Sequence, residues 1–512
     1  MTTTAPAASP STGNSAKLDR SVLIVAGVVV LGAIMSILDI TVVSVALPTF
    51  ETVFHTSYAN VAWTMTGYTL ALATVIPLTG WAADRFGTKR LYMLAVTLFV
   101  LGSTLCSTAS SIGELIGFRV LQGLGGGMLM PLGMTIMTRA AGPERIGRVM
   151  AVLGIPMLLG PIGGPILGGW MIESLSWHWI FLINVPIGII AFVYALFALP
   201  KDAPTPSETF DFLGMLMLSP GLALFLFGVS SIPGEGRLTA TRVWLPALVG
   251  LILVGLFIRH AFRPQHPLID LRLFKNRQLS VAVITMFLFG VAFFGALLLV
   301  PSYFLQVRGS STLHAGLLMA PQGIGAMITM PIAGVLADKT GIGKIVLTGL
   351  TLITAGMVVL TQLTASTPYA LILGALFVMG LGMGATMMPI MTSALQTLRD
   401  QTVARGSTLM NIMQQIASSV GAAVMSVVLT DQIKNSQFAG PAIASWSNPS
   451  VASQLPPGAV AKGLSDAASG FATTFTVALA LVVLTFIPAL FVPRRKVVGQ
   501  TEEEPAAAVL VH

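Results

Sequence analysis

Two charged residues stand inside long apolar runs of the sequence, and they are the first candidates for chemistry. Asp39 lies in ILDITVVSVALP and Arg119 lies in GFRVLQGLGGG. A charge near the middle of a membrane is costly, so such a residue faces a cavity or a partner. We expect Asp39 to take up and release a proton, while Arg119, with Gln122 one turn on, adjusts its proton affinity or polarises a linking water. The alternative is a static ion pair, or hydrogen bonding to the backbone, that only holds helices together.

A second group of charges follows the apolar run of residues 60–83. Asp84 is predicted at a helix C-terminus, where the helix dipole is unfavourable to an anion, so it needs a specific partner. We expect it to latch the cytoplasmic side by bonding to a neighbouring helix N-terminus or to Arg145 or Arg148. The alternative is charge that only sets the topology. The candidate gating residues are Gly80, Asp84, Arg85, Gly87, Arg90 and, in a similar later segment, Asp338.

The segment GIPMLLGPIGGPILGGW places small residues on one helix face. Gly160, Gly164 and Gly168 are four residues apart, a spacing that lets helix backbones approach closely in lipid. Pro161 and Pro165 remove two backbone donors and should bend or soften this helix. We expect a tight but deformable contact with the other half of the protein, with plain close packing as the alternative.

Polar residues in later apolar runs are candidates for a substrate cavity. The run of residues 405–431 carries Asn411 and Gln414 in a polar stripe, which either lines a wet cavity or bonds to neighbouring helices. Trp63 and Tyr68 are interface anchors first and ligand contacts second. Asn184 is a further candidate for contact with a substrate.

Several classes of chemistry are disfavoured by what the sequence lacks. There is one cysteine, Cys106, and there are six histidines, none in the middle of an apolar span. We find no nucleotide-binding, protease, esterase or metal-ligand motif, so we predict no catalytic residues, no metal and no cofactor. The basic residues are scattered in short segments, which argues against nucleic-acid binding. An ion gradient must then supply the energy for any transport.

The composition indicates a chain that folds in a lipid bilayer. It has 512 residues, of which 54% are hydrophobic and 9% charged, whereas a soluble protein carries about 25% charged residues. Residues 1–20, rich in Pro, Thr and Ser, are predicted to be a disordered cytoplasmic tail. Fourteen membrane-spanning helices are expected at 21–48, 60–83, 91–110, 112–138, 147–171, 177–199, 212–231, 242–261, 279–303, 314–337, 344–364, 368–391, 405–431 and 470–492.

The distribution of basic residues predicts the orientation. If both termini are cytoplasmic, five of the 27 Lys and Arg residues fall outside, and Arg119 falls in a helix; the five are Arg237, Arg242, Arg308, Lys434 and Lys462. This is the imbalance that the positive-inside rule requires. With these helices, Asp39 and Arg119 lie at similar depth, about 10–13 Å below the outer ends, so they can make contact.

Two pairs of similar segments reveal an internal repeat. GWAADRFGTKR (80–90) resembles GVLADKTGIGK (334–344), and GLGGGMLMP (123–131) resembles GLGMGATMMP (380–389). Both offsets correspond to eight helices. We therefore predict two six-helix halves, 21–199 and 279–492, a linker with two inserted helices at 200–278, and a cytoplasmic tail at 493–512. Duplicated helical halves are a recurrent plan of secondary transporters.

The same segments resemble the major facilitator superfamily, and within it the fourteen-helix drug:proton antiporters. LDITVVSVALP, GWAADRFGTKR and RVLQGLGGG are similar to that family's motifs in helix 1, the helix 2–3 loop and helix 4. GIPMLLGPIGGPILGG is similar to its antiporter motif, and WHWIFLINVPIG and HPLIDLRLFKNR are further family-like stretches. Ser44, Thr88 and His178 differ from the residues usual in the family at those positions.

The resemblance implies an all-α integral membrane protein with the major facilitator fold. It implies export of hydrophobic, often cationic compounds across a bacterial cytoplasmic membrane in exchange for protons. Its proton-linked acid, helix 4 arginine and gating aspartate fall on Asp39, Arg119 and Asp84. We expect a monomer whose partners are the lipid bilayer, protons and a small-molecule substrate, neutral or singly charged. A dedicated exporter of an endogenous lipid, siderophore or metabolite is the second hypothesis, and a non-transporting membrane sensor or enzyme is the third.

Overall fold

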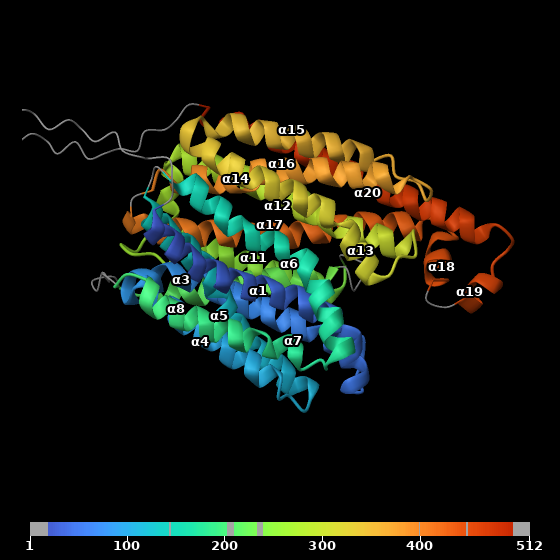
Figure 1. Ribbon diagram of the computed structural model, residues 1–512, viewed down its shortest axis with the longest axis horizontal. Coiled ribbons are helices and arrows are strands. Elements are labelled where there is room, and N and C mark those ends of the chain that lie inside the picture. Colours follow the sequence, from blue (N-terminus) through green and yellow to red (C-terminus); the bar gives the residue numbers. More distant parts are fainter. Residues whose placement is uncertain are drawn as a thin grey trace, which may run out of the picture.

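The structure is a computed structural model that describes residues 19–142, 145–201, 209–232, 239–398, 400–446 and 449–494. Long helices lie side by side along one axis of the molecule (Figure 1). The predicted tails 1–20 and 493–512 lie outside the described residues, apart from Asp19, Arg20, Pro493 and Arg494. The described part of the chain contains no β-strand.

Each predicted apolar run is helical, although the runs 60–83, 177–199 and 314–337 are each divided into two helices, and several helices extend beyond the predicted ends. The helices of the first half and the insertion are α1 (Arg20–Val53), α2 (Tyr58–Val61), α3 (Trp63–Phe86), α4 (Thr88–Cys106), α5 (Ile112–Ala141), α6 (Ile146–Ser174), α7 (Trp179–Leu182), α8 (Asn184–Ala198), α9 (Phe212–Ser230) and α11 (Thr241–Ala261). Those that follow are η1 (Leu271–Lys275), α12 (Arg277–Gln306), α13 (Thr312–Leu318), α14 (Ala320–Lys339), α15 (Ile342–Leu360), α16 (Tyr369–Leu395), α17 (Asp400–Lys434), α18 (Ala439–Ala444), α19 (Pro449–Ser453) and α20 (Ala459–Ala489).

Twelve helical segments among the described residues are long and apolar enough to cross a membrane. Two further long helices, α3 with 24 residues and α6 with 29, are not among these twelve. The described ends of the chain lie at the same end of the bundle (Figure 1). There Arg145 at the start of α6 pairs with Asp19 at 2.7 Å, and the Gly343 N–H donates to the Pro493 carbonyl at 2.8 Å.

Glycines in the two repeated segments permit equivalent close packing in the two halves. In α5, a Cβ on Gly123 would lie 2.5 Å from the Tyr68 carbonyl of α3, and one on Gly125 would lie 2.5 Å from the Phe99 nitrogen of α4. In α16, glycines of the matching segment pack on α14 and α15 in the same way; they are Gly380, Gly382 and Gly384. The internal repeat is therefore also a repeat in how the helices pack.

The glycine stripe of α6 faces α1, which belongs to the same half, so the expected contact with the other half is wrong for this face. A Cβ on Gly160 would lie 2.1 Å from Ile37, and one on Gly164 would lie 2.1 Å from the Thr41 hydroxyl. A Cβ on Gly168 would meet Val42 at 3.2 Å. The side chains of Pro161 and Pro165 lie outside the described residues.

The contact of α6 with the other half lies nearer its start. A Cβ on Gly154 would collide with Met330 of α14, and one on Gly334 of α14 would lie 2.7 Å from the Gly147 carbonyl. Helix α6 therefore joins α1 on one face to α14 on another, because small residues stand on both faces.

The close approach of α1 and α6 gives the first prediction. We expect Gly164→Ala to lower the free energy of unfolding by about 1–3 kcal/mol, since a methyl group there must displace Thr41. The matched control is Gly169→Ala on the same helix, where a Cβ meets nothing within 4 Å. Thermal unfolding of both variants in detergent measures the difference. Equal unfolding midpoints for the two variants would contradict the close α1–α6 contact.

Candidate functional site

Asp39 and Arg119 form a direct ion pair, and Gln122 joins it. Arg119 Nη1 donates to Asp39 Oδ2 at 2.5 Å and to Gln122 Oε1 at 2.7 Å. Gln122 Nε2 donates to the other carboxylate oxygen, Asp39 Oδ1, at 2.8 Å. The side chains of Asp39 and Arg119 are 0% exposed. The three residues that the sequence selected therefore share one buried cluster.

The start of α5 fixes the position of Arg119 along the bundle. Ser111 caps the helix by accepting from the Glu114 N–H at 3.3 Å, and the Glu114 carboxylate accepts from the Ser110 N–H at 2.9 Å. These two hydrogen bonds satisfy backbone donors at the helix start and help to set where the helix begins. Arg119 and Gln122 follow three residues apart, so both side chains point toward α1 from adjacent turns.

Asn184 and Ser103 complete the polar surroundings of the carboxylate. Asn184 Nδ2 donates to Asp39 Oδ1 at 3.2 Å and to Ser103 Oγ at 3.0 Å. Gln122 Nε2 also donates to Ser103 Oγ, at 3.1 Å, and this hydroxyl donates to the Phe181 carbonyl at 2.9 Å. Sequence reasoning missed Ser103. It named Asn184 as a substrate-cavity candidate, which stays a prediction, and did not link this residue to Asp39.

Asn184 lies where α7 passes into α8. Helix α7 ends at Leu182 and α8 begins at Asn184, but Ile183 between them keeps helical dihedral angles, so the two form one span. Pro186 in the first turn of α8 has no N–H to donate to the Leu182 carbonyl, so one helical hydrogen bond is missing here. From this position Asn184 reaches Asp39.

Aromatic rings cover the other side of Arg119. Its guanidinium lies 4.2 Å from the centroid of the Tyr68 ring and 5.9 Å from that of Phe181, and its Nε donates to the Thr64 carbonyl at 3.2 Å. Within the described part of the chain, Arg119 Nη2 has no hydrogen-bond partner. Tyr68 was expected as an interface anchor or ligand contact. In the structure its ring lies against the buried Arg119 cation.

A small apolar pocket lies beside the carboxylate. It is a space between α1, α6, α7 and α8 with room for about one water molecule. Among the described residues that line it, Asp39 and Asn184 alone have polar side chains; the others are Leu38, Val42, Leu167, Met171, Ile180, Ile183 and Ile187. In this conformation the carboxylate is sealed from bulk water by protein.

Protonation of Asp39 would change the net charge of the cluster by one unit, at a high electrostatic cost. As an ion pair, Asp39 and Arg119 carry no net charge. A proton on Asp39 removes the charge that offsets Arg119 and uses a lone pair that now accepts from Arg119, Gln122 or Asn184. Because an unpaired buried cation is expensive, protonation must be accompanied by a rearrangement or by another ligand.

Asp84 forms ion pairs with arginines of both halves. Its Oδ1 lies 3.2 Å from Arg139 Nη2 on α5, and its Oδ2 lies 3.7 Å from Arg405 Nε on α17. The expected partner Arg145 instead pairs with Asp19. Arg405 was not foreseen, since no local pattern links residues 321 positions apart in the sequence.

The other gating candidates lie around this contact. Gly80 faces α17, because a Cβ there would lie 3.0 Å from the Thr408 hydroxyl. Gly87 has a φ of +92°, which glycine adopts easily, and it joins α3 to α4. Arg85 is partly exposed and Arg90 is exposed, at the ends of these two helices. Asp338 lies in α14, but its side chain is outside the described residues.

The structure does not gather the substrate-cavity candidates in one place. Asn411 of α17 donates to the Ser407 carbonyl at 2.8 Å and lies 3.1 Å from the Met134 sulfur of α5, across the two halves. Gln414 is partly exposed on α17. Trp63 stacks on Phe227 of α9 with ring centroids 5.4 Å apart. No group of three or more His, Cys, Asp and Glu side chains that could hold a metal occurs in the described residues.

Comparisons with known proteins agree on one family. The model of the Major Facilitator Superfamily matches residues 29–422. The multidrug resistance protein B homolog of Mycobacterium tuberculosis is 48% identical over 508 residues, covering 96% of this chain and 94% of that protein. The putative multidrug resistance protein MdtD of Escherichia coli is 31% identical over 407 residues, covering 78% of this chain and 85% of that protein.

A solved structure supports the fold. The human organic anion transporter MFSD10 (TETRAN) superimposes with a TM-score of 0.62 at 16% identity, covering 91% of this chain and all of that one. At this identity the likeness concerns the fold alone.

The buried ion pair gives the second prediction. We expect Arg119→Gln to lower the free energy of unfolding by about 3–5 kcal/mol, because it leaves the Asp39 carboxylate buried without its cation. The double variant Asp39→Asn with Arg119→Gln removes both charges and should regain part of that loss. Unfolding of wild type, both single variants and the double variant in detergent measures the coupling. A double variant no more stable than Arg119→Gln would contradict the pairing.

Proposed function

The chain belongs to the Major Facilitator Superfamily and is a multi-pass membrane transporter, not an enzyme; from that premise, we propose that it exports hydrophobic or cationic small molecules by proton antiport. The observation that carries the proposal is the buried Asp39–Arg119 ion pair, closed in by Gln122 and Asn184. A carboxylate that sits in the bilayer and has a ready counter-ion is suited to bind and release a proton. The names of the two bacterial relatives support drugs as the cargo.

The proposed cycle uses Asp39 as the proton carrier and Arg119 as its switchable partner. Proton binding weakens the ion pair and frees Arg119, whose positive charge then disfavours a cationic cargo nearby. Release of the proton restores the pair and makes room for the cargo's charge. Gln122 and Asn184 hold the carboxylate in place in the unprotonated state.

Asp84 is proposed to latch the cytoplasmic end of the two halves. Its contact with Arg405 joins α3 to α17, so an opening of the halves at this end must break it. The contact with Arg139 lies within the first half and can persist. On this reading the conformation described here is closed on the cytoplasmic side.

We also propose the number of spans, the orientation of the chain and its division into halves. Twelve candidate spans together with α3 and α6 make fourteen, and the basic residues favour cytoplasmic termini in a bacterial cytoplasmic membrane. The proposed divisions are two six-helix halves, 21–199 and 279–492, joined by the inserted pair in 200–278. We propose that the transporter acts as a monomer.

Proton coupling gives the third prediction. In proteoliposomes with an imposed pH gradient, Asp39→Asn should abolish proton-driven uptake of a fluorescent lipophilic cation such as ethidium, since an amide cannot carry the proton. The matched control is Glu173→Gln, an acid-to-amide change at an exposed position of α6 in the same half, which should retain uptake. Size-exclusion chromatography establishes that both variants are folded.

Two outcomes would redirect the proposal. Unaltered coupling in Asp39→Asn would remove Asp39 as the carrier. Growth inhibition across a compound panel, in cells with and without the protein, separates broad drug efflux from dedicated export of one endogenous lipid, siderophore or metabolite. Protection against a single compound would favour the dedicated exporter.

A further inference from the structure

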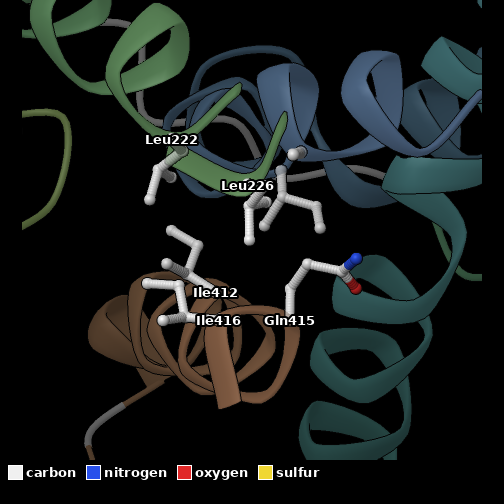
Figure 2. A pocket seen from close by; sticks show the side chains of 7 residues that line it. Leu222, Leu226, Ile412, Gln415 and Ile416 are labelled. Carbon is white, nitrogen blue, oxygen red and sulfur yellow. The ribbon is translucent and has the colours of Figure 1, made fainter. Parts of the chain in front are cut away.

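A small space elsewhere in the bundle offers a comparison with the pocket beside Asp39. It lies between α3, α9 and α17, and each of the two has room for about one water molecule. Figure 2 shows the Gln415 amide beside leucine and isoleucine side chains. Among the described residues that line this space, Gln415 alone has a polar side chain, whereas Asp39 and Asn184 both line the other. Since a buried water makes about two to four hydrogen bonds, the pocket beside Asp39 is the better water site.

The carboxylate of Asp39 has room for one more hydrogen bond. Its Oδ1 accepts from Gln122 and from Asn184, whereas Oδ2 accepts from Arg119 alone. A carboxylate offers about four lone-pair positions, shared equally by its oxygens, so one position on Oδ2 is unused within the described residues. A water that donates to Oδ2 would fill this position without displacing a present donor.

The amide of Asn184 also has an unused acceptor. Its Nδ2 donates to Asp39 Oδ1 and to Ser103 Oγ, and no described residue donates to its Oδ1. The residue is only 1% exposed, and an amide oxygen that is buried without a donor costs free energy. Asp39 and Asn184 are 3.2 Å apart at their bonded atoms and line the same pocket. One water in that pocket can donate to both.

The position of the pocket indicates the side from which a proton arrives. Its described walls belong to the first half alone, at α1, α6, α7 and α8. Val42 follows Asp39 by three residues in α1, and Met171 lies three residues before the end of α6. Ile180 lies in α7, just after the link from α6. In the proposed orientation these walls lie on the outer side of Asp39, and the cytoplasmic latch is at the opposite end.

We propose that the pocket beside Asp39 binds one water molecule, which donates to Asp39 Oδ2 and to Asn184 Oδ1 and delivers protons to Asp39 from the outer side. Asn184 is then a positioning residue, because it holds the water against the carboxylate. The inference rests on the proposed antiport and deepens it, since it names the last proton donor on the route. That donor lies within the first half, apart from the interface between the halves.

The transfer balances with the water and one proton alone. The bound water accepts a proton from the outer side on its oxygen. Its O–H bond toward Asp39 Oδ2 breaks as a new O–H bond forms on the carboxylate, so the water is regenerated. Asp39 becomes neutral, and Arg119 is left with an uncompensated charge. Loss of the ion pair then favours the rearrangement that the proposed cycle needs.

The fourth prediction fills the pocket from two different segments. Leu167→Phe and Ile183→Phe, at two partly exposed lining positions, should each lower the maximal rate of proton-driven ethidium uptake by about 10-fold or more, because a phenyl ring displaces the relay water. The KM for ethidium should stay within about twofold of wild type, since the change acts on proton delivery. The matched control is Ile190→Phe on α8, at a position that is 58% exposed, and it should keep the wild-type rate.

A direct measurement of the water does not depend on transport. Short X-ray pulses turn bound water into hydroxyl radicals, which oxidise a neighbouring methionine. Met171 lines the pocket and is 2% exposed, so its oxidation in detergent-purified protein should far exceed that of Met357, which lies in α15 at 0% exposure. In Leu167→Phe and Ile183→Phe, the oxidation of Met171 should fall to the level of Met357.

Two substitutions of Asn184 test its positioning role. Asn184→Ser keeps an oxygen that accepts from the water, whereas Asn184→Leu offers none at nearly the size of asparagine. The serine variant should retain the oxidation of Met171 and at least about 10 times the maximal uptake rate of the leucine variant. A role in helix packing alone predicts the reverse order of rates, because leucine fills the space better than serine does.

The outcomes separate this inference from the function beneath it. Oxidation of Met171 no greater than that of Met357 in the wild type would overturn the water site, as would wild-type uptake rates in both filling variants. Either result leaves antiport standing if Asp39→Asn still abolishes coupling. Absence of proton-driven uptake in the wild type would overturn antiport, and the oxidation of Met171 would still decide whether the water is bound. If one filling variant does not fold, the other carries the test.

Discussion

The burial of the Asp39 carboxylate against the Arg119 guanidinium constrains the rest of the first half. Neither charge can stay in an apolar surrounding without the other and without further hydrogen bonds. The donors to Asp39 are Arg119 and Gln122 of α5 and Asn184 of α8, and Ser103 of α4 accepts a hydrogen bond from Asn184. Those helices must converge at one depth, and the glycines of α5 make this possible by letting α3 and α4 lie against its backbone.

Helix α1, which carries Asp39, also packs against α6, and α6 contacts α14 of the second half. One face of α1 presents the carboxylate to α5 and α8, and another presents Ile37 and Thr41 to the glycine stripe of α6. Helix α6 in turn meets α14 at Gly154. A shift of α1 on protonation would therefore reach the interface between halves through two contacts that have little room to absorb it.

The sequence predicted which buried charged residues form the site, but not the direction in which each polar side chain points. Asp39 and Arg119 stood out because charges are rare in apolar runs, and Gln122 followed from its spacing. Ser103 gave no such signal, because a serine in an apolar helix most often bonds to its own backbone, as Ser107 does with the Thr104 carbonyl. Asn184 was visible as a polar residue, but the direction of its side chain depends on how α8 packs against α1.

The second feature that the sequence did not predict is which helices lie next to each other. The stripe of Gly160, Gly164 and Gly168 identified a close contact, yet its partner is α1 rather than a helix of the other half. Likewise Asp84 was expected to need a cation, and Arg139 and Arg405 are decided by the tertiary arrangement. The repeats reveal which helices correspond, whereas the rotation of each helix about its axis depends on packing that no short motif encodes.

The neutral ion pair bears on how proton and cargo can exclude each other in the proposed antiport. A proton or a monovalent cation brings the site from zero to one positive charge, and both together bring it to two. At an effective dielectric constant of about 20, two like charges about 10 Å apart repel by about 1.7 kcal/mol, a factor of about 15–20 in affinity. Competition therefore needs no shared binding position. The apolar body of a cargo can lie at a distance from Asp39, while its charge alone opposes the proton. A neutral cargo would escape this repulsion, and its exchange for protons would have to depend on the helix movements alone.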